Sequence, residues 1–392
     1  MTLDLDLSPS ALAPPPPPPF APVLGKIEAR LRQAQQSHLG QPFNLVREMP
    51  LPANLSSYFI VNQGDPYAGS LLGADVCDLE CEVISWLMAL WQADRPEAYW
   101  GSVGASGTES NFWALYLARE ALPDAIVVYA RDAHYSIPKS ARILRMPTQV
   151  VDCEPSGAMS PGSLKSVLSR LRSSQVIVAV TCGTPAKGAH DDIGAIMQVL
   201  EQSGFPEHRR YVHVDGALSA LVLPFLADVP QTLRPSFRHG IDSISASGHK
   251  MIGTPMPCGV LLARRQHAER VASGSSYLRS HDTTFMGARN GHAVLALWAR
   301  LFGHGIVGFR LDARRSVSRA RSLAAALEEA GVPILLNRFS FTVVFPRPDD
   351  TIGNRYQLAC SGDNAHAVVM PSVSERLLQQ FAADYLDWWA RS

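Results

Sequence analysis

The chain has 392 residues, of which 46% are hydrophobic and 18% charged, so it can form two or three domains with a sizeable buried core. This length excludes a miniprotein held together by disulfides. The 35 basic and 35 acidic residues balance, which removes any general electrostatic reason to bind nucleic acid or an anionic membrane. We therefore expect a small molecule as the partner.

The N-terminal region predicts a tail without a targeting or membrane segment. Residues 1–13 are acidic, whereas a secretory signal begins with basic residues. The longest apolar candidate, residues 81–91, is interrupted by Glu82 and Ser85 and is shorter than the roughly 18 residues that a bilayer crossing needs. Six prolines at 14–19 predict a polyproline II stretch, so residues 1–22 are interpreted as a solvated tether or as a ligand for a partner's aromatic groove. We expect a cytoplasmic protein.

The six cysteines are scattered through apolar stretches of the sequence. Only Cys77 and Cys81 lie close together, and zinc usually needs a second close pair of Cys or His. We therefore predict reduced thiols in the core and no metal site.

The predicted elements follow one another in a clear order. Residues 23–75 form an N-terminal segment, with a helix from Lys26 and irregular chain to about Gly73. An apolar helix over 76–91 opens a large domain, residues 76–300. Apolar runs then predict buried strands at 125–130, 149–153, 176–181, 211–215, 242–247 and 258–263. Helical patterns separate most of them, for example where Ser160 and Pro161 give an N-cap and a first-turn proline.

This alternation predicts an α/β fold with an open, mostly parallel sheet covered by helices on both faces. Ligands of such sheets bind beyond the carboxyl ends of the strands. After a helix over about 290–330, short apolar runs at 334–337, 341–346, 356–360 and 365–370 precede an amphipathic helix at 373–390. Residues 301–392 are therefore predicted to form a smaller α+β domain.

Lys250 is the first candidate for chemistry, among only five lysines. It follows the predicted strand 242–247 and precedes a loop rich in Gly and Pro, so its side chain is expected to enter a cleft. Desolvation there would lower the pKa of the amine and free it as a nucleophile. The position fits a Schiff-base lysine, although by itself it does not distinguish one from an ordinary surface lysine.

Asp215 ends the apolar strand 211–215, where a carboxylate is costly to bury without a cationic or hydrogen-bonding partner. A protonated pyridine nitrogen would be such a partner. The two charges would attract by about 4 kcal/mol at roughly 4 Å with an effective dielectric constant near 20. The alternative is an Asp that caps the next helix.

Residues 101–111, GSVGASGTESN, are rich in Gly and Ser and precede the helical run 112–122. Small residues let backbone N–H groups approach an anion, and a helix N-terminus adds positive potential. Thr108 is predicted to be both the N-cap and a phosphate ligand. The segment is neither a Walker A loop nor a GxGxxG motif, and a plain capped turn is the alternative.

His134 follows the strand 125–130 in the sequence DAHYS. It could stack on a flat cofactor and transfer protons, or it could be merely structural. All four candidate sites fall at predicted strand ends or a helix start of one sheet. A phosphate cradle, a ring stack, an acid for a ring nitrogen and an amine for an aldehyde together describe pyridoxal 5′-phosphate (PLP).

Several stretches resemble the PLP-dependent group II amino acid decarboxylases of fold type I, the fold of aspartate aminotransferase. They are SGTESN, DAHYS, HVDGALS, IDSISASGHKMIGTPMPCG and HDTTFMGARNGH, with FTVVFP and SGDNAH in the predicted small domain. The resemblance runs from about residue 38 to the C-terminus and is closest to bacterial histidine decarboxylases and plant-type serine decarboxylases. It implies a PLP-binding large domain, a small α+β domain, and a homodimer whose two chains line each active site.

The resemblance also implies a role for each matching residue. Lys250 would form the Schiff base with the cofactor, Asp215 would bind the pyridinium nitrogen, and His134 would stack on the ring. Tyr277 resembles the mobile-loop tyrosine that helps protonate the α-carbon after carbon dioxide leaves. Ala217 would pack beneath the ring and Thr184 would approach its phenolic oxygen. The phosphate pocket would consist of Ser106, Gly107, Thr108, Ser247 and His249.

Two positions depart from the family pattern. Gly216 stands where alanine is usual, which we expect at most to loosen the strand end. Pro185 follows Thr184 where a second threonine is typical, which leaves the role of Thr184, and with it the substrate pocket, open.

The implied reaction converts an L-amino acid to its amine and carbon dioxide. L-Histidine leads as the substrate by overall resemblance, L-serine follows, and other small or basic amino acids stay open. An aminotransferase or a carbon–sulfur lyase could share the cofactor frame, although an aminotransferase needs an arginine that grips the α-carboxylate. A catalytically silent scaffold, recruiting a partner through its proline tail, is the alternative from another class.

Overall fold

The structure is a computed structural model, which describes residues 20–45, 49, 51–68, 73–275 and 280–391. The polyproline stretch and Tyr277 lie outside these residues. Contacts divide the chain into two units, residues 1–38 and 39–392. The first unit contains α1 (Phe20–Gln36), which begins before Lys26 and includes Pro22 in its first turn, where a missing N–H removes no helical bond.

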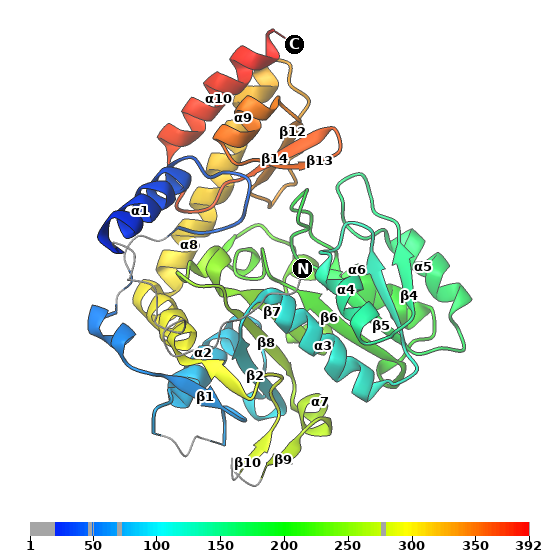
Figure 1. Cartoon of the computed structure of the whole chain (residues 1–392). Coiled ribbons are helices and arrows are strands. Elements are labelled where there is room, and N and C mark those ends of the chain that lie inside the picture. The colour runs from blue at the N-terminus through cyan, green and yellow to red at the C-terminus, as the bar shows by residue number, and fades with distance from the viewer. Residues whose placement is uncertain (1–19, 46–48, 50, 69–72, 276–279, 392) are drawn as a thin grey trace, which may run out of the picture. The chain divides into compact units, whose positions relative to one another are not determined.

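A seven-stranded sheet forms the centre of the second unit, in the order β2-β8-β7-β6-β5-β3-β4 (Figure 1). Only β8 runs antiparallel to its neighbours, so the other six strands point the same way. Their carboxyl ends therefore meet at one edge. The strands are β2 (Tyr99–Gly104), β3 (Ile126–Ala130), β4 (Thr148–Val151), β5 (Val176–Thr181), β6 (Arg210–Asp215), β7 (Ser243–Ser247) and β8 (Gly259–Arg264).

All six strands predicted for this sheet are confirmed to within two residues at each end. The sequence did not predict β2, because its Gly and Ser residues suggested a loop. The mostly parallel α/β sheet is thus confirmed, with β8 inserted between β2 and β7 as its single antiparallel member.

Helices cover both faces of this sheet. Leu115, Ile137 and Ala268 of α3, α4 and α7 belong to apolar clusters on one face, while Val83, Ile193 and others belong to the cluster on the opposite face. The helices are α2 (Cys77–Leu90), α3 (Gly107–Ala121), α4 (Ser136–Ile143), α5 (Pro161–Arg170), α6 (Ile193–Gln202), α7 (Arg265–Arg270) and α8 (Gly291–Glu329). The short 3-10 helices are η1 (Ala53–Ser57), η2 (Pro96–Ala98), η3 (Glu207–Arg209), η4 (Leu223–Phe225), η5 (Gln231–Leu233) and η6 (Phe237–His239).

The 39-residue α8 is broken at Gly305, where φ is +65°. In the described part of the chain it is the one helix whose length and apolar composition would suffice to cross a membrane. Core helices of soluble proteins pass the same test, and Leu297 and Leu301 of α8 are fully buried within this protein.

The N-terminal part of the second unit is less irregular than predicted. There, β1 (Val61–Gln63) pairs antiparallel with β11 (Ala288–Asn290), 225 or more residues further along the chain. A second small ladder joins β9 (Ser273–Ser275) to β10 (Ser280–Asp282).

The predicted α+β elements of the C-terminal region are confirmed. An antiparallel sheet of order β12-β14-β13 is flanked by two helices. The elements are β12 (Thr342–Pro346), α9 (Asp350–Arg355), β13 (Ala359–Ser361), β14 (Asn364–Val368) and α10 (Glu375–Trp389). The apolar run at 334–337 forms only a single bridge, from Leu335 to Val344, and no strand. The domain boundary between residues 300 and 301 stays a prediction, and α8 runs across it.

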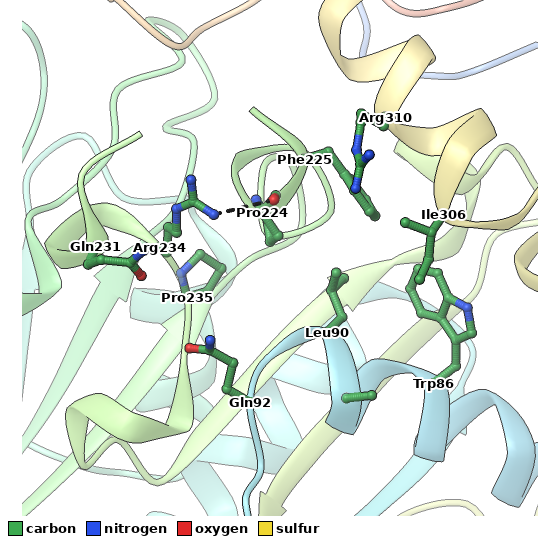
Figure 2. Close-up of a pocket in the computed structure, with 11 residues that line it drawn as sticks. Trp86, Leu90, Gln92, Pro224, Phe225, Gln231, Arg234, Pro235, Ile306 and Arg310 are labelled. Carbon is green, nitrogen blue, oxygen red and sulfur yellow. Dashed lines mark hydrogen bonds between the residues drawn. The ribbon is translucent and has the colours of Figure 1, made fainter. Parts of the chain in front are cut away.

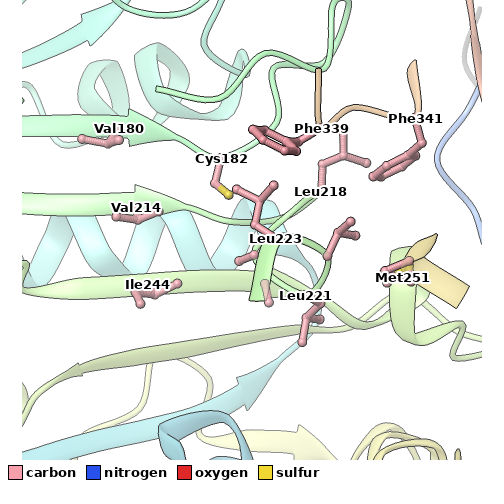
Figure 3. Close-up of a cluster of buried hydrophobic side chains, with 14 of the residues drawn as sticks. Val180, Cys182, Val214, Leu218, Leu221, Leu223, Ile244, Met251, Phe339 and Phe341 are labelled. Atoms are coloured by element: carbon pink, nitrogen blue, oxygen red, sulfur yellow. The ribbon is translucent and has the colours of Figure 1, made fainter. Parts of the chain in front are cut away.

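The apolar core continues from the large sheet into the C-terminal region. Figure 3 shows Phe339 and Phe341, which precede β12, beside Leu218 and Met251 beyond the ends of β6 and β7. All six cysteines are free, but Cys360 is exposed on β13, so the prediction of core thiols is wrong there. The reason is that β13 lies at the edge of its sheet.

Candidate active site

Lys250 lies beyond the carboxyl end of β7, in the short π-helical turn η7 (Gly248–Ile252). The helical geometry is broken at this residue, with φ −85° and ψ −114°. Burial lowers the pKa of the Lys250 amine, and the nearby Asp215 carboxylate partly opposes this shift. Lys250 is therefore a half-buried amine beside a carboxylate rather than an ordinary surface lysine.

Asp215 is the last residue of β6 and only 4% exposed. Its Oδ2 accepts a hydrogen bond from Nδ2 of Asn111 at 2.8 Å, and its Oδ1 accepts one from the backbone N–H of Ala217 at 3.1 Å. The next helical element, η4, starts eight residues later at Leu223. Asp215 therefore does not cap the following helix, and the alternative interpretation of this residue is wrong.

His134 lies just after β3 and is held by Ser136. Its Nδ1 is 2.7 Å from Oγ of Ser136 and accepts the backbone N–H of the same residue at 3.2 Å. Burial is the main cause that lowers the pKa of His134; Lys250 lowers it further and Asp215 raises it. The imidazole of His134 therefore lies close enough to Asp215 and Lys250 for both charges to affect its pKa.

The start of α3 supplies the Gly- and Ser-rich segment. The N-cap is Ser106, whose Oγ accepts the backbone N–H of Glu109 at 3.2 Å, while the Glu109 carboxylate accepts the N–H of Ala105 at 2.7 Å. This arrangement resembles a capping box. The prediction of Thr108 as the N-cap is wrong, because the helix begins at Gly107 and Thr108 is already within its first turn.

Gly107 packs where no side chain fits. A Cβ at Gly107 would lie 2.4 Å from Oγ of Ser247 and 3.6 Å from the Cβ of Ala217. The start of α3 and the ends of β6 and β7 therefore meet closely. The helix start is therefore surrounded by small residues, which is the composition that a phosphate cradle requires.

The loop of Lys250 is held by the N-terminal part of the same unit. The backbone N–H of Asn44 donates to the carbonyl of His249 at 3.3 Å, and its side chain donates to the carbonyl of Met251 at 3.0 Å. The ring of Phe43 lies 5.7 Å from that of His249. Burial and the adjacent Lys250 both lower the pKa of His249.

Of the two positions that depart from the family pattern, Gly216 is tightly packed, whereas Pro185 is exposed and follows the buried Thr184. A Cβ at Gly216 would lie 2.6 Å from the carbonyl oxygen of Ser245, so glycine permits close packing here rather than loosening the strand end. Thr184 is fully buried, and its Oγ1 accepts the N–H of Ala189 at 3.0 Å across the turn that contains Pro185. Its approach to a cofactor stays a prediction.

Three residues that hydrogen-bond in a network with Asp215 are not predicted from the sequence. Asn111, His213 and Ser245 are at most 1% exposed and share one hydrogen-bond network with the carboxylate. A signal was present in the sequence, since Tyr211, His213 and Asp215 alternate along β6 as polar residues on one face. The helical partner Asn111 could not be found from that pattern.

Residues 75–345 match the family described as the pyridoxal-dependent decarboxylase conserved domain. The chain belongs to this family. This pyridoxal-dependent decarboxylase is 40% identical to serine decarboxylase 1 of Oryza sativa subsp. japonica over 362 residues, which cover 92% of the chain and 74% of the rice protein. It is 37% identical to the histidine decarboxylase of Pseudomonas entomophila (strain L48) over 313 residues, 79% of the chain and 77% of that protein.

The fold of the decarboxylase agrees with solved structures. L-Methionine decarboxylase from Streptomyces sp. 590 superposes with a TM-score of 0.82 at 24% identity, covering 94% of this chain and 95% of that one. The expected fold type I architecture is thereby confirmed. The protein is a PLP-dependent amino acid decarboxylase. Because the chain belongs to a family of enzymes, the alternative of a catalytically silent scaffold is excluded.

The residues present fit the cofactor. The half-buried amine of Lys250 and the buried carboxylate of Asp215 follow the adjacent strands β7 and β6, and the Gly107 helix start packs against the end of β7, so the chain offers groups suited to an aldehyde, a ring nitrogen and a phosphate group at one edge of the sheet. A separate hollow of about 370 Å³ between α2, α8 and the segment 224–235 has none of these residues in its wall (Figure 2).

Proposed function

We propose that this decarboxylase acts on L-serine, with L-histidine as the second candidate. The support for serine is the 40% identity with the rice serine decarboxylase, which extends over 92% of the chain. The support for histidine is the 37% identity with the Pseudomonas enzyme over 79% of the chain. The order is the reverse of the expectation from resemblance alone, and it rests on the longer and slightly closer match.

We propose these roles for the site residues. Lys250 binds the cofactor aldehyde, Asp215 binds the ring nitrogen, and His134 lies on one ring face with Ala217 on the other. Thr184 approaches the phenolic oxygen. The phosphate group is held by Ser106, Gly107, Thr108, Ser247 and His249. The observation that carries this assignment is that Lys250, Asp215 and His134 follow three strands whose carboxyl ends meet at one edge of the sheet, where the Asp215 carboxylate raises the pKa of both Lys250 and His134 against the effect of burial.

When bound, the cofactor accepts the electron pair that the departing carboxyl group leaves behind. The chain's own residues prepare for this step. Burial favours the neutral, nucleophilic form of Lys250. Asp215 holds a proton on the ring nitrogen, so that the ring stays electron-withdrawing. His134, whose Nδ1 accepts from Ser136, keeps its proton on Nε2. Tyr277, outside the described residues, is proposed to deliver the proton that replaces carbon dioxide.

An aminotransferase is not favoured by the buried arginines of the described part. Arg289 pairs with Glu80 and donates to the carbonyl of Gly64, while Nε of Arg300 donates to the carbonyl of Ile252 at 2.8 Å. Arg289 is therefore engaged by a carboxylate and a backbone carbonyl of the protein itself, and Arg300 is held by a backbone carbonyl.

The substrate is tested by measuring carbon dioxide release from each of the twenty amino acids by the purified, cofactor-loaded enzyme. We expect L-serine to be converted to ethanolamine with a kcat/KM at least tenfold above that for L-histidine, a difference of about 1.4 kcal/mol in the barrier. A higher kcat/KM for L-histidine would establish the second candidate instead. A keto acid product would contradict decarboxylation, and Lys250→Ala serves as the inactive control.

We further propose that the enzyme is a homodimer with shared active sites. The support is a group of exposed apolar side chains on α8, in which Val307 is 69% exposed and Ile306 52%. Together with Trp86 and Leu90 of α2, Ile306 lines the hollow shown in Figure 2. Contiguous exposed apolar surface of this kind marks interaction sites.

A cytoplasmic location is also proposed. It is supported by the six free cysteines, which stay reduced in that compartment. Fractionation of cells that express the full chain tests this, and recovery of the protein with membranes would contradict it.

A further inference from the structure

The centre of the sheet is polar on the face that α3 covers. Along β6, Val212 and Val214 point into the large apolar cluster, whereas His213 and Asp215 point to the opposite face. Parallel strands covered by helices are normally apolar on both faces. Here Ser243 and Ser245 of β7 join His213 and Asp215, and all four are at most 4% exposed. This polar surface includes Asp215, the residue proposed above to bind the cofactor ring nitrogen.

The side-chain amide of Asn111 hydrogen-bonds to several of these polar residues. Nδ2 of Asn111 donates to Oδ2 of Asp215 at 2.8 Å and to Oγ of Ser136 at 2.9 Å. Oδ1 of Asn111 accepts from Oγ of Ser245 at 2.7 Å and from Nε2 of His213 at 3.0 Å. Both donors and both acceptor positions of the amide are thus used. Turning the amide over would set its oxygen against the Asp215 carboxylate, which can only accept hydrogen bonds, so this contact fixes the orientation of the amide.

The network reaches two groups of the proposed site at once. The first branch is the direct bond to the Asp215 carboxylate. The second passes through Ser136, whose Oγ accepts from Asn111 and is therefore free to point its own hydrogen at Nδ1 of His134, 2.7 Å away. The backbone N–H of Ser136 also donates to Nδ1. Both contacts favour the tautomer of His134 with its proton on Nε2.

We propose that Asn111 is a positioning residue, which fixes the carboxylate of Asp215 against the cofactor ring nitrogen and, through Ser136, the tautomer of His134. This inference rests on the roles proposed above for Asp215 and His134. Asn111 itself touches neither the cofactor nor the substrate. Its effect is to hold the groups on which the ring depends.

A merely structural role is the competing explanation, and the chain offers a matched control for it. Asn62 is also fully buried, and its Nδ2 donates to a buried carboxylate, Oε2 of Glu80, at 2.7 Å. The substitution Asn62→Asp therefore brings two buried carboxylates together just as Asn111→Asp does. Asn62 shares no hydrogen bond with Asp215, Ser136 or His134 among the described residues.

The test uses apoenzyme prepared from the wild type, Asn111→Ala, Asn111→Asp and Asn62→Asp. Each is titrated with PLP, and the visible absorbance band is followed at several pH values, with the thermal unfolding midpoint measured alongside. We expect Asn111→Ala to bind PLP about tenfold to a hundredfold more weakly at every pH, because a hydrogen bond to a charged group is lost.

For Asn111→Asp we expect a pH-dependent PLP affinity, which a merely structural role does not predict. At high pH two carboxylates face each other, and PLP binding is expected to be weaker than in Asn111→Ala. As the pH falls, the introduced carboxyl group becomes protonated and again donates to Asp215, so that affinity recovers. Asn62→Asp should lower the unfolding midpoint and leave PLP affinity, and its pH dependence, as in the wild type.

Ser136→Ala separates the two branches. It should leave PLP affinity close to that of the wild type and change the pH profile of kcat, since only the His134 branch is cut. If Asn111→Asp does not fold, Ser245→Ala provides the milder change, because it removes one of the two hydrogen bonds that hold the amide oxygen. It should weaken PLP binding in the same direction.

Asn111 variants that fold and bind PLP as tightly as the wild type at all pH values would overturn the inference. That failure differs from a failure of the proposed function. Borohydride reduction of the wild-type protein with PLP should label Lys250, and labelling with unchanged Asn111 variants would remove only the role of Asn111. An unlabelled wild type would remove the roles of Lys250 and Asp215 on which the inference rests.

Discussion

Buried polar side chains at the centre of the sheet make the protein sensitive to acid. His213 is fully buried between Asn111 and Ser243, and burial lowers its pKa from 6.5 to about 4, with Asp215 partly opposing the shift. In the unfolded chain the same imidazole binds a proton near pH 6.5. Between these values the unfolded state therefore holds more protons, and the free energy of unfolding falls as the pH is lowered.

We expect the apoprotein to lose up to about 3 kcal/mol of stability from this one group between pH 6.5 and pH 4. The variant His213→Gln, which can still donate to Asn111, should lose correspondingly less over the same interval. Urea unfolding at a series of pH values measures the difference. His208→Gln, at an exposed position, is the control, and parallel curves for wild type and His213→Gln would contradict the assigned pKa.

At the scale of single elements, the first turn of α3 matters most, because it places Ser106, Gly107 and Thr108 at the edge where the strands end. The N-cap bond from Glu109 to Ser106 fixes where the helix starts. The side chain of Ser160 does the same for α5, where it accepts the N–H of Ser163 at 3.4 Å, far from any proposed site residue in the sequence.

We expect Ser106→Ala to lower the unfolding free energy of the apoprotein by about 1 kcal/mol, the usual value of an N-cap side chain. Ser160→Ala should destabilise the apoprotein by a similar amount. Only Ser106→Ala should also weaken PLP binding, which a titration of both variants measures. Equal PLP affinities in the two variants would show that the start of α3 does not hold the phosphate group.

The elements show what the sequence could and could not predict. Buried parallel strands such as 176–181 were found because they are continuous apolar runs between helical patterns. β2 was missed because its Gly101 and Gly104 suggest a loop, and its strand pairing with β8 joins residues far apart in the chain. The pairing of β1 with β11 escaped for the same reason.

For the site residues too, those with a local sequence pattern could be predicted and those that depend on distant contacts could not. Lys250, Asp215 and His134 could be predicted because each ends a local pattern, a strand that opens into a loop. Asn111 could not be predicted, since its function depends on contacts with β6 and β7, more than 100 residues away. The N-cap was misplaced by two residues because Ser106 and Thr108 are both capping residue types and the backbone conformation decides between them.

At the scale of the whole molecule, the apolar surface of α8 suggests association of two chains. We expect the wild-type enzyme to sediment as a dimer. Val307→Asp places a charge in this surface and should shift the equilibrium toward the monomer, which analytical ultracentrifugation measures. Ile143→Asp makes the same kind of change on α4, at a side chain that is 57% exposed, and should leave the dimer intact. A dimer unaffected by Val307→Asp would place the interface elsewhere.

The central claim is that the amine of Lys250 carries the cofactor. It is tested most directly by saturating the purified protein with PLP, reducing it with borohydride and mapping the labelled peptide. The account predicts a single label on Lys250, and in Lys250→Ala neither the label nor the visible absorbance band nor turnover. A label on another of the five lysines, or no label in the wild-type protein, would contradict it.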